Sequence, residues 1–171
     1  MQRYFAMFAA YNRWANARLY DAVAKVSGAD YRADRGAFFG SLNGTLNHLL
    51  VTDRIWMRRF TGHGPQPTRL NEILFDTLPA LREARRAEDE RILAYVEGLD
   101  DAALAGTITY RTITKPTDIT QPLTPALAHL FNHQTHHRGQ AHTLLTIVGG
   151  RDAAPPLDLL YFQRETGTGL G

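Results

Sequence analysis

The chain has 171 residues, 44% of them hydrophobic and 21% charged, and a formal net charge of +2, which indicates one ordinary soluble domain and does not favour a nucleic-acid partner. It contains no cysteine, which excludes disulfides, thiolate metal ligands and a cysteine nucleophile and is compatible with the reducing cytoplasm that we expect as its location. Because the N-terminal residues lack the unbroken apolar core of a signal peptide and no apolar run approaches the ~20 residues that span a bilayer, we expect no export and no membrane partner.

Two amphipathic helices are predicted in the first part of the chain. Residues 3–27 carry apolar side chains at i, i+3 and i+4, which predicts a helix that ends near Gly28. Asn12 lies inside the apolar stripe of this helix, which is unusual for an amide side chain. Residues 41–60 show the same periodicity, and the sequence Gly62-His63-Gly64-Pro65 ends this second helix.

The middle of the chain combines a loop, a helix and an extended insertion. Residues 70–78 indicate a loop with at most a short turn of helix. Pro79 suits the first turn of a third helix over residues 78–98, which ends at Gly98. Residues 107–120 are rich in threonine and isoleucine and alternate in polarity at their start, which favours a short hairpin or extended excursion.

A fourth long helix is predicted over residues 125–148, begun by a Thr-Pro pair and ended by two glycines. A short apolar helix over residues 157–165 follows. Four long helices with one extended insertion predict an all-α fold, a helix bundle. We expect residues 1–166 to form a single domain and residues 167–171 to form a flexible C-terminal tail.

Short arginine pairs occur at Arg58-Arg59 and Arg85-Arg86. A nucleic-acid-binding face needs a longer run or a stripe of lysine and arginine. We therefore expect both pairs on solvated helix faces and find little electrostatic support for DNA binding.

The predicted fourth helix carries two histidines, His133 and His137, four residues apart. Residues at this spacing lie one above the other on the same helical face, so their imidazoles can hold one divalent cation. Both lie beside the apolar stripe of the helix, where an imidazolium is costly to desolvate and a shared cation is the better partner. A third histidine, His48 of the predicted second helix, could complete a three-nitrogen site with an open position for water or substrate.

The other histidines leave the ligand assignment open on spacing alone. His129 and His133 form a competing pair four residues apart, although His129 lies further from the apolar stripe. His136 and His137 are neighbours whose side chains diverge by about 100°, so both do not fit one ion. The alternative without metal is that these are ordinary hydrogen-bonded or half-exposed histidines. Two more histidines are interpreted as surface or loop residues: His63 and His142.

Gln134 follows His133 at the position where the metalloprotease motif H-E-x-x-H has its glutamate. That glutamate is the general base of the peptidase reaction. Because a glutamine cannot accept a proton at neutral pH, peptidase chemistry of that kind is disfavoured.

The chain resembles the DinB/YfiT-like family of small helical-bundle metalloproteins over nearly its whole length. The most specific match is the block HxxxHRGQ that begins at His133. The matching stretches are Tyr11–Asn16, Leu46–Leu50, His129–Gln140 and Leu157–Leu160. This resemblance implies an up-down-down-up four-helix bundle that is often a homodimer.

The resemblance also implies that His48, His133 and His137 hold a divalent metal ion, with zinc or nickel as the associated metals. Relatives with known chemistry are thiol-dependent transferases and isomerases, which implies a small-molecule substrate and a low-molecular-weight thiol cosubstrate. The thiol must come from outside because the chain has no cysteine. An ion held by three neutral histidines keeps its full charge and makes a bound thiol or water more acidic.

Three functions stay open, of which a metal-dependent thiol transferase leads. The others are a metal-dependent hydrolase that uses metal-bound hydroxide and a non-catalytic bundle whose metal only fixes the helices. No side chain is identified as the catalytic acid or base. For Asn12, a buried amide that satisfies backbone groups or a dimer contact is as good an interpretation as a site role. Trp56 is interpreted as a core residue. For the two aspartates, a surface or capping role is the preferred interpretation. The residues that could support the site are Asn12, Tyr11, Trp56, Asp53 and Asp158.

Overall fold

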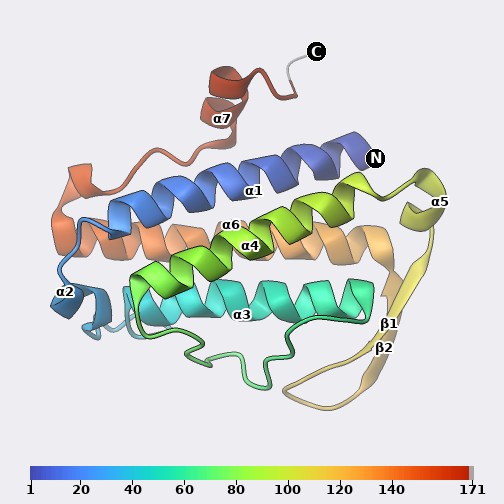
Figure 1. Cartoon of the computed structure of the whole chain (residues 1–171), viewed down its shortest axis with the longest axis horizontal. Helices are drawn as coiled ribbons and strands as arrows, with labels where there is room; N and C mark the ends of the chain where they lie inside the picture. The colour runs from blue at the N-terminus through green and yellow to red at the C-terminus, as the bar shows by residue number, and fades with distance from the viewer. Residues whose placement is uncertain (170–171) are drawn as a thin grey trace.

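The computed structural model describes residues 1–169 and is mostly helical within that range, with one small antiparallel sheet (Figure 1). Four long helices of the described range lie side by side: α1 (Gln2–Val23), α3 (Leu42–Thr61), α4 (Leu78–Glu97) and α6 (Leu123–Gly149). Both α1 and α3 pack against α4 and α6. In Figure 1, α1 and α6 run in one direction, and α3 and α4 run in the opposite direction.

Shorter elements connect and flank the long helices. They are α2 (Gly28–Arg32), α5 (Asp101–Leu104), β1 (Thr107–Arg111), β2 (Asp118–Pro122), the 3₁₀ helix η1 (Arg151–Ala153) and α7 (Leu159–Thr166). The two strands pair antiparallel, with Thr107 opposite Pro122 and Arg111 opposite Asp118. The predicted hairpin is therefore confirmed.

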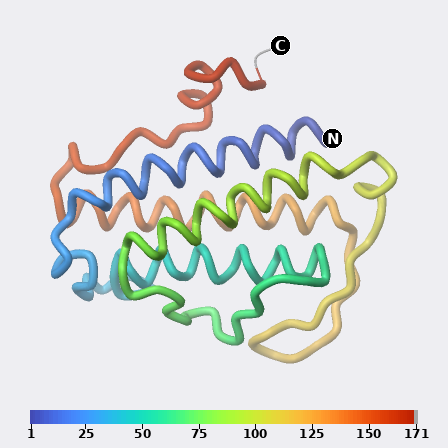
Figure 2. The backbone as a smooth tube through the Cα atoms, viewed as in Figure 1, coloured from blue at the N-terminus to red at the C-terminus, as the bar shows by residue number. Residues whose placement is uncertain are grey.

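Residues 62–77 connect α3 to α4 by running back along the outside of α3 (Figure 2). A long connection is needed because α3 and α4 point the same way, so the chain must return to the end at which α3 began. This return path brings the residues near position 70 beside the first half of α3. A backbone carbonyl of that segment takes part in the candidate site described below.

The first predicted helix ends earlier than expected. α1 ends at Val23, whereas the periodicity predicted a helix as far as residue 27. The cause is a second, short helix: the Ser27 hydroxyl accepts the amide hydrogen of Asp30 and so begins α2 at Gly28. Gly28 begins a helix instead of ending one.

The other long helices agree with the prediction to within two residues. The Ser41 hydroxyl accepts the amide hydrogen of Gly44 at the start of α3, and Gly62, with a left-handed φ of +78°, ends that helix. α6 begins at Leu123, two residues before its predicted start, where the Leu123 amide donates to the carbonyl of Gly106 at the base of the hairpin.

The C-terminal tail predicted over residues 167–171 lies partly outside the described residues, which end at 169. Gly167 has a left-handed φ of +71° and ends α7. In the described part of the chain, no helix has both the length and the apolar character that crossing a bilayer requires.

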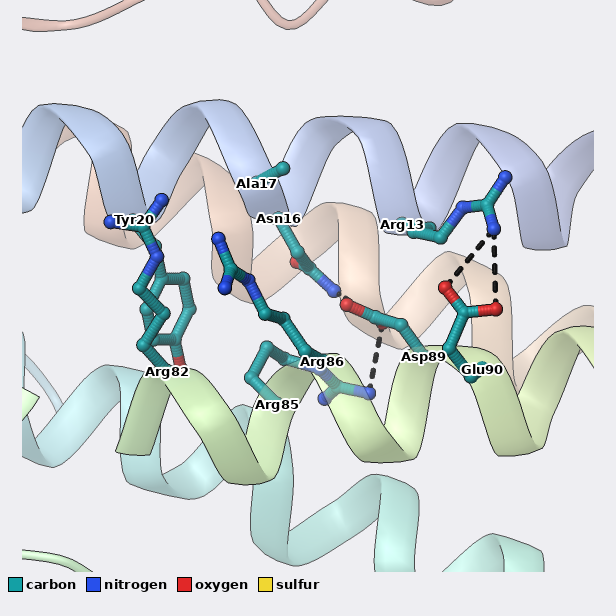
Figure 3. A pocket seen from close by; sticks show the side chains of 9 residues that line it. All are labelled: Arg13, Asn16, Ala17, Tyr20, Arg82, Arg85, Arg86, Asp89 and Glu90. Atoms are coloured by element: carbon teal, nitrogen blue, oxygen red, sulfur yellow. Dashed lines mark hydrogen bonds and ion pairs between the residues drawn. The ribbon is translucent and has the colours of Figure 1, made fainter. Parts of the chain in front are cut away.

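A buried ionic network lies between α1, α3, α4 and α6. Arg85 of α4 is 2% exposed and donates to Asp53 of α3 over 2.7 Å. It also lies 3.0 Å from Asp89 of α4, and Figure 3 shows this pair. Asn16 of α1 also donates to Asp89, over 2.9 Å. The expectation that Arg85 lies on a solvated face is wrong because two carboxylates pair with its charge inside the protein, whereas its neighbour Arg86 is exposed.

Replacement of Arg85 by alanine should destabilise the protein by about 3–5 kcal/mol, since it leaves two buried carboxylates without their cation. Chemical denaturation of the two variants Arg85→Ala and Arg86→Ala measures this effect. The exposed Arg86 is the matched control on the next helical position, and its loss should leave the free energy of unfolding nearly unchanged. Equal stability of the two variants would contradict a structural role for the network.

Candidate metal site

Three histidines converge across the contact between α3 and α6. His48 of α3 faces His137 of α6, with their Nε2 atoms 3.2 Å apart. One turn along, Thr52 of α3 faces His133 of α6, with Oγ1 3.5 Å from Nδ1. One ligand atom from each of the three histidines lies within 4.8 Å of the others. The structure thus brings together the three residues that the resemblance selected, and could hold a metal ion among them.

Hydrogen bonds on the far side of the rings determine which nitrogens face one another. Nδ1 of His48 lies 2.8 Å from the carbonyl oxygen of Leu70, and Nδ1 of His137 lies 2.8 Å from Oε1 of Gln140. Because these oxygens can only accept, each Nδ1 carries the proton of the neutral ring. Both Nε2 atoms therefore present lone pairs, and two lone pairs that face each other repel unless a cation lies between them.

His133 has a weaker support from α3, since its Nδ1 lies 3.5 Å from Oγ1 of Thr52. The Thr52 hydroxyl donates to the carbonyl of His48 over 2.9 Å, so its oxygen remains available to accept from Nδ1 of His133. This leaves Nε2 of His133 as the ring nitrogen without a proton. Partners of this kind fix the tautomer and orientation of metal-binding histidines.

Burial keeps the imidazoles neutral. Desolvation, with a smaller contribution from His137, lowers the pKa of His48 to about 4, although the hydrogen bond to Leu70 acts in the opposite direction. Desolvation, followed by repulsion from the neighbouring histidines, lowers the pKa of His133 to about 3. Desolvation also lowers the pKa of His137. Neutral imidazole is the form that binds metals.

A pocket of about 760 Å³ opens above the histidines. One of its walls is Phe39, whose ring stacks on His48 with the ring centroids 3.8 Å apart. The pocket is bounded by segments from three connections of the chain, each of which contributes an apolar side chain. Its lining residues besides the histidines are Phe38, Phe39, Thr68, Arg69, Leu70, Asn71, Ile113 and Thr114.

The remaining histidines lie outside this group. The His129 ring contacts that of His133 at a centroid distance of 5.7 Å but packs against Trp56 at 5.0 Å. His136 is exposed, and His142 lies against the carbonyl of Pro155 at 3.0 Å. His63 lies in the exposed connection after α3, as expected.

Gln134 does not point into the pocket. Its side chain is fully buried and donates to the Asp53 carboxylate and to the Leu49 carbonyl. A glutamate at this position would meet the buried carboxylate of Asp53 instead of a substrate. The geometry and the chemistry of the amide thus agree in giving position 134 a structural role.

The supporting residues considered from the sequence have mainly structural contacts. Asn12 is a buried amide, as one of the interpretations has it, but its partners are side chains and not backbone groups: it donates to the buried Asp89 and accepts from Arg138. Asp53 is buried in the ionic network, which corrects its expected surface or capping role, because Arg85 neutralises it there.

The other three supporting residues are placed as follows. Trp56 lies in the apolar core, as expected, and the Asp158 carboxylate accepts the Leu160 amide and caps α7, as expected. The Tyr11 hydroxyl donates to the carbonyl of Leu157 over 2.7 Å and so ties α1 to the segment before α7.

Sequence reasoning did not identify the groups that orient the rings. Gln140 lies three residues after His137 on the same helical face, so its spacing carried a usable signal. The Leu70 carbonyl is a backbone group of a loop, and Phe39 reaches His48 from the loop before α3; neither position has a signal in the sequence.

In the metal-free protein, His48 and His133 should stay neutral at pH 5, where a histidine with the ordinary pKa of about 6.5 is mostly protonated. The stability consequence follows from proton uptake. The unfolded chain binds these protons near pH 6.5, whereas the folded chain binds them near pH 4 at His48 and near pH 3 at His133. The two histidines therefore lower the stability as the pH falls from about 6.5 through these values, and not above pH 6.5. NMR titration of the ring signals, with the urea-unfolded chain as control, measures the protonation. Titration of both folded rings near pH 6.5 would refute this expectation.

Comparison with known proteins identifies the family of the chain. The sequence model of the DinB family matches residues 1–168. The curated Protein DinB of Bacillus subtilis (strain 168) is 25% identical over 171 aligned positions, which cover 91% of this chain and 92% of that protein. Since the family match extends over nearly the whole chain, this protein belongs to the DinB family.

Proposed function

We propose that the protein binds one divalent metal ion through His48, His133 and His137 and uses it to activate a small thiol for transfer to a small electrophile. The observation that carries the proposal is that the Nε2 atoms of His48 and His137 face each other at 3.2 Å, while both Nδ1 atoms lie against oxygen acceptors. Two nitrogens bound to a tetrahedral zinc ion lie roughly 3.4 Å apart, so the observed spacing fits such an ion. Imidazole ligands suit zinc and nickel.

When bound, the ion would supply a positive charge that lowers the pKa of a coordinated thiol or water. The chain's own residues do the positioning. Leu70 and Gln140 hold the two facing rings in the tautomer that presents Nε2. Phe39 covers one face of His48 and so keeps water from that ring.

The pocket lining favours thiol transfer over hydrolysis. Among the described residues, neither Asp nor Glu lines the pocket, so it offers no carboxylate to remove a proton from water. A thiol ionises far more readily than water and needs no such base once a cation is near. The apolar side chains of Phe38, Leu70 and Ile113 fit the carbon skeleton of an electrophile.

We further propose that the four long helices form the up-down-down-up bundle of the family and that two copies associate as a homodimer. The helix directions in Figure 1 and the contacts of α1 and α3 with the other two helices support the bundle. Exposed aromatic side chains on α1 and α7, among them Tyr4 and Tyr161, are compatible with a dimer. Light scattering tests association: we expect twice the mass of the chain, and a monomeric mass at working concentration would refute the dimer.

Metal titration of the purified protein tests the ligand set. We expect one zinc or nickel ion per chain, and each of the variants His48→Ala, His133→Ala and His137→Ala should lose at least about 100-fold in affinity. Gln140→Leu removes only a supporting hydrogen bond and should lose about 10–100-fold.

His63→Ala is the matched control for this titration. His63 is an exposed histidine of the connection after α3 and lies outside the three-histidine group, so its loss should leave the affinity unchanged. Unaltered binding in all three ligand variants would place the ion elsewhere and overturn the proposal.

Turnover tests the reaction. The metal-loaded protein, assayed with a panel of low-molecular-weight thiols and alkyl or epoxide electrophiles, should form thioethers, and removal of the metal should abolish the reaction. Turnover of esters or amides without a thiol would instead establish the hydrolase. A folded, metal-loaded protein that turns over neither set would contradict both enzymatic functions.

A further inference from the structure

A second pocket, of about 310 Å³, adjoins the pocket of the histidines, and Ile113 lines both. It lies where the end of α3 meets the hairpin. Among residues 1–169, three arginines and no Asp or Glu line it: Arg58, Arg59 and Arg111. Arg69 adds a further cation to the lining of the first pocket. The two adjoining pockets are thus lined by four arginines and, among the described residues, by no Asp or Glu, before any metal charge is counted.

Arg59 is held in place without a partner of opposite charge. Its guanidinium lies over the Trp56 ring, 4.5 Å from the centroid, and over the Tyr110 ring, 4.2 Å from the centroid. Within the described chain it makes no ion pair and donates no hydrogen bond. A half-buried guanidinium that is oriented by aromatic faces but unpaired has its N–H groups available to an anion.

The neighbouring arginines are already engaged. Arg58 donates to the carbonyl of Gly64 over 2.8 Å, and Arg111 pairs with Asp118 at 3.0 Å. They add positive potential but do not have a free guanidinium face comparable to that of Arg59. Arg59, which we expected on a solvated helix face, is half buried between the rings of Trp56 and Tyr110, so that expectation is wrong.

Another arginine-rich pocket, between α1 and α4, serves as a comparison (Figure 3). There Arg13 pairs with Glu90, and Arg85 pairs with Asp89 inside the protein. Arg13 and Arg85 are two of the four arginines that line that pocket; of the other two, Arg82 pairs with Asp21 and Arg86 is exposed. No Asp or Glu lines the Arg59 pocket among the described residues, so an anion there meets Arg59 without a competing carboxylate.

Helix geometry relates Arg59 to the histidines. Positions 48, 52 and 59 lie on one face of α3, and Thr52 faces His133. Seven residues separate Thr52 from Arg59, which is about 10 Å along the axis at a rise of 1.5 Å per residue. A ligand that touches both places must be elongated.

We propose that Arg59 binds a carboxylate or phosphate group of an elongated ligand whose other end reaches the histidines. The ligand class is therefore an anionic thiol or an anionic electrophile. This inference rests on the proposed metal site for the position of the reacting end, but none of the three histidines lines the anion subsite itself.

Cobalt(II)-loaded protein and two probes of equal length test the inference. The probes are mercaptooctanoate and the neutral mercaptooctanol, and the sulfur-to-cobalt absorption band measures binding of either one at the metal. Wild type should bind the carboxylate probe about tenfold or more tightly than the alcohol, as expected for a charge-assisted hydrogen bond. In Arg59→Gln this preference should disappear while binding of the alcohol stays unchanged.

The matched control is Arg86→Gln, which removes an exposed arginine from α4 and should keep the full preference. Equal affinity of the two probes in wild type, or a preference that survives in Arg59→Gln, would overturn the inference while leaving the metal site intact. Absence of the cobalt band with both probes would refute the metal proposal instead.

A second readout tests the anion subsite without metal. The chain has two tryptophans, each of which gives one indole N–H signal in an NMR spectrum. The Trp56 ring lies beneath the guanidinium of Arg59, and the Trp14 ring lies beneath that of Arg18. Titration of the metal-free protein with inorganic phosphate at constant ionic strength should shift the Trp56 signal saturably and the Trp14 signal hardly at all. Equal shifts of both signals, or an unchanged response in a folded Arg59→Gln variant, would refute an anion site at Arg59.

Discussion

The contact between Gln134 and Asp53 holds the candidate site together. It joins α6 to α3 one residue away from His133 on one helix and one residue away from Thr52 on the other. Gln134 also donates to the Leu49 carbonyl, next to His48. A small sliding of one helix past the other would break these bonds and separate the facing imidazoles. The position that carries a glutamate base in metalloproteases is used here to fix the spacing of the helices.

The interior of the protein is divided into a charged side and a neutral side. On the charged side, Arg85 lies between Asp53 and Asp89, so buried ions neutralise one another. On the neutral side, the histidines have lost their charge to burial, and their unprotonated nitrogens face each other. Asp53 belongs to the first side and supports the second through Gln134. This division explains how a strongly polar helix interface can be stable and still present nitrogen lone pairs that are available to a metal ion.

Much of this arrangement could be predicted from the sequence, because the signals were local. The spacing of His133 and His137 determines that their side chains share one helical face, and glycines mark the ends of α3, α4 and α7. His48 was a candidate third ligand on the predicted second helix, but only the family resemblance selected it, because nothing in local spacing relates it to α6. Arg85 was misplaced because its partner Asp53 on α3 becomes its neighbour only after folding, although Asp89, four residues further along α4, was a local signal. The same holds for Arg59, whose aromatic partner Tyr110 belongs to the hairpin.

The most direct test of the central claim is the coordination of a bound zinc ion, measured by X-ray absorption at the zinc edge. We expect three imidazole nitrogens at about 2.0–2.1 Å and at least one further light atom from solvent. In His137→Ala, the number of imidazole rings that accounts for the multiple scattering should fall from three to two. A closed shell made of four protein ligands, or fewer imidazoles in the native protein, would contradict an open ion held by His48, His133 and His137.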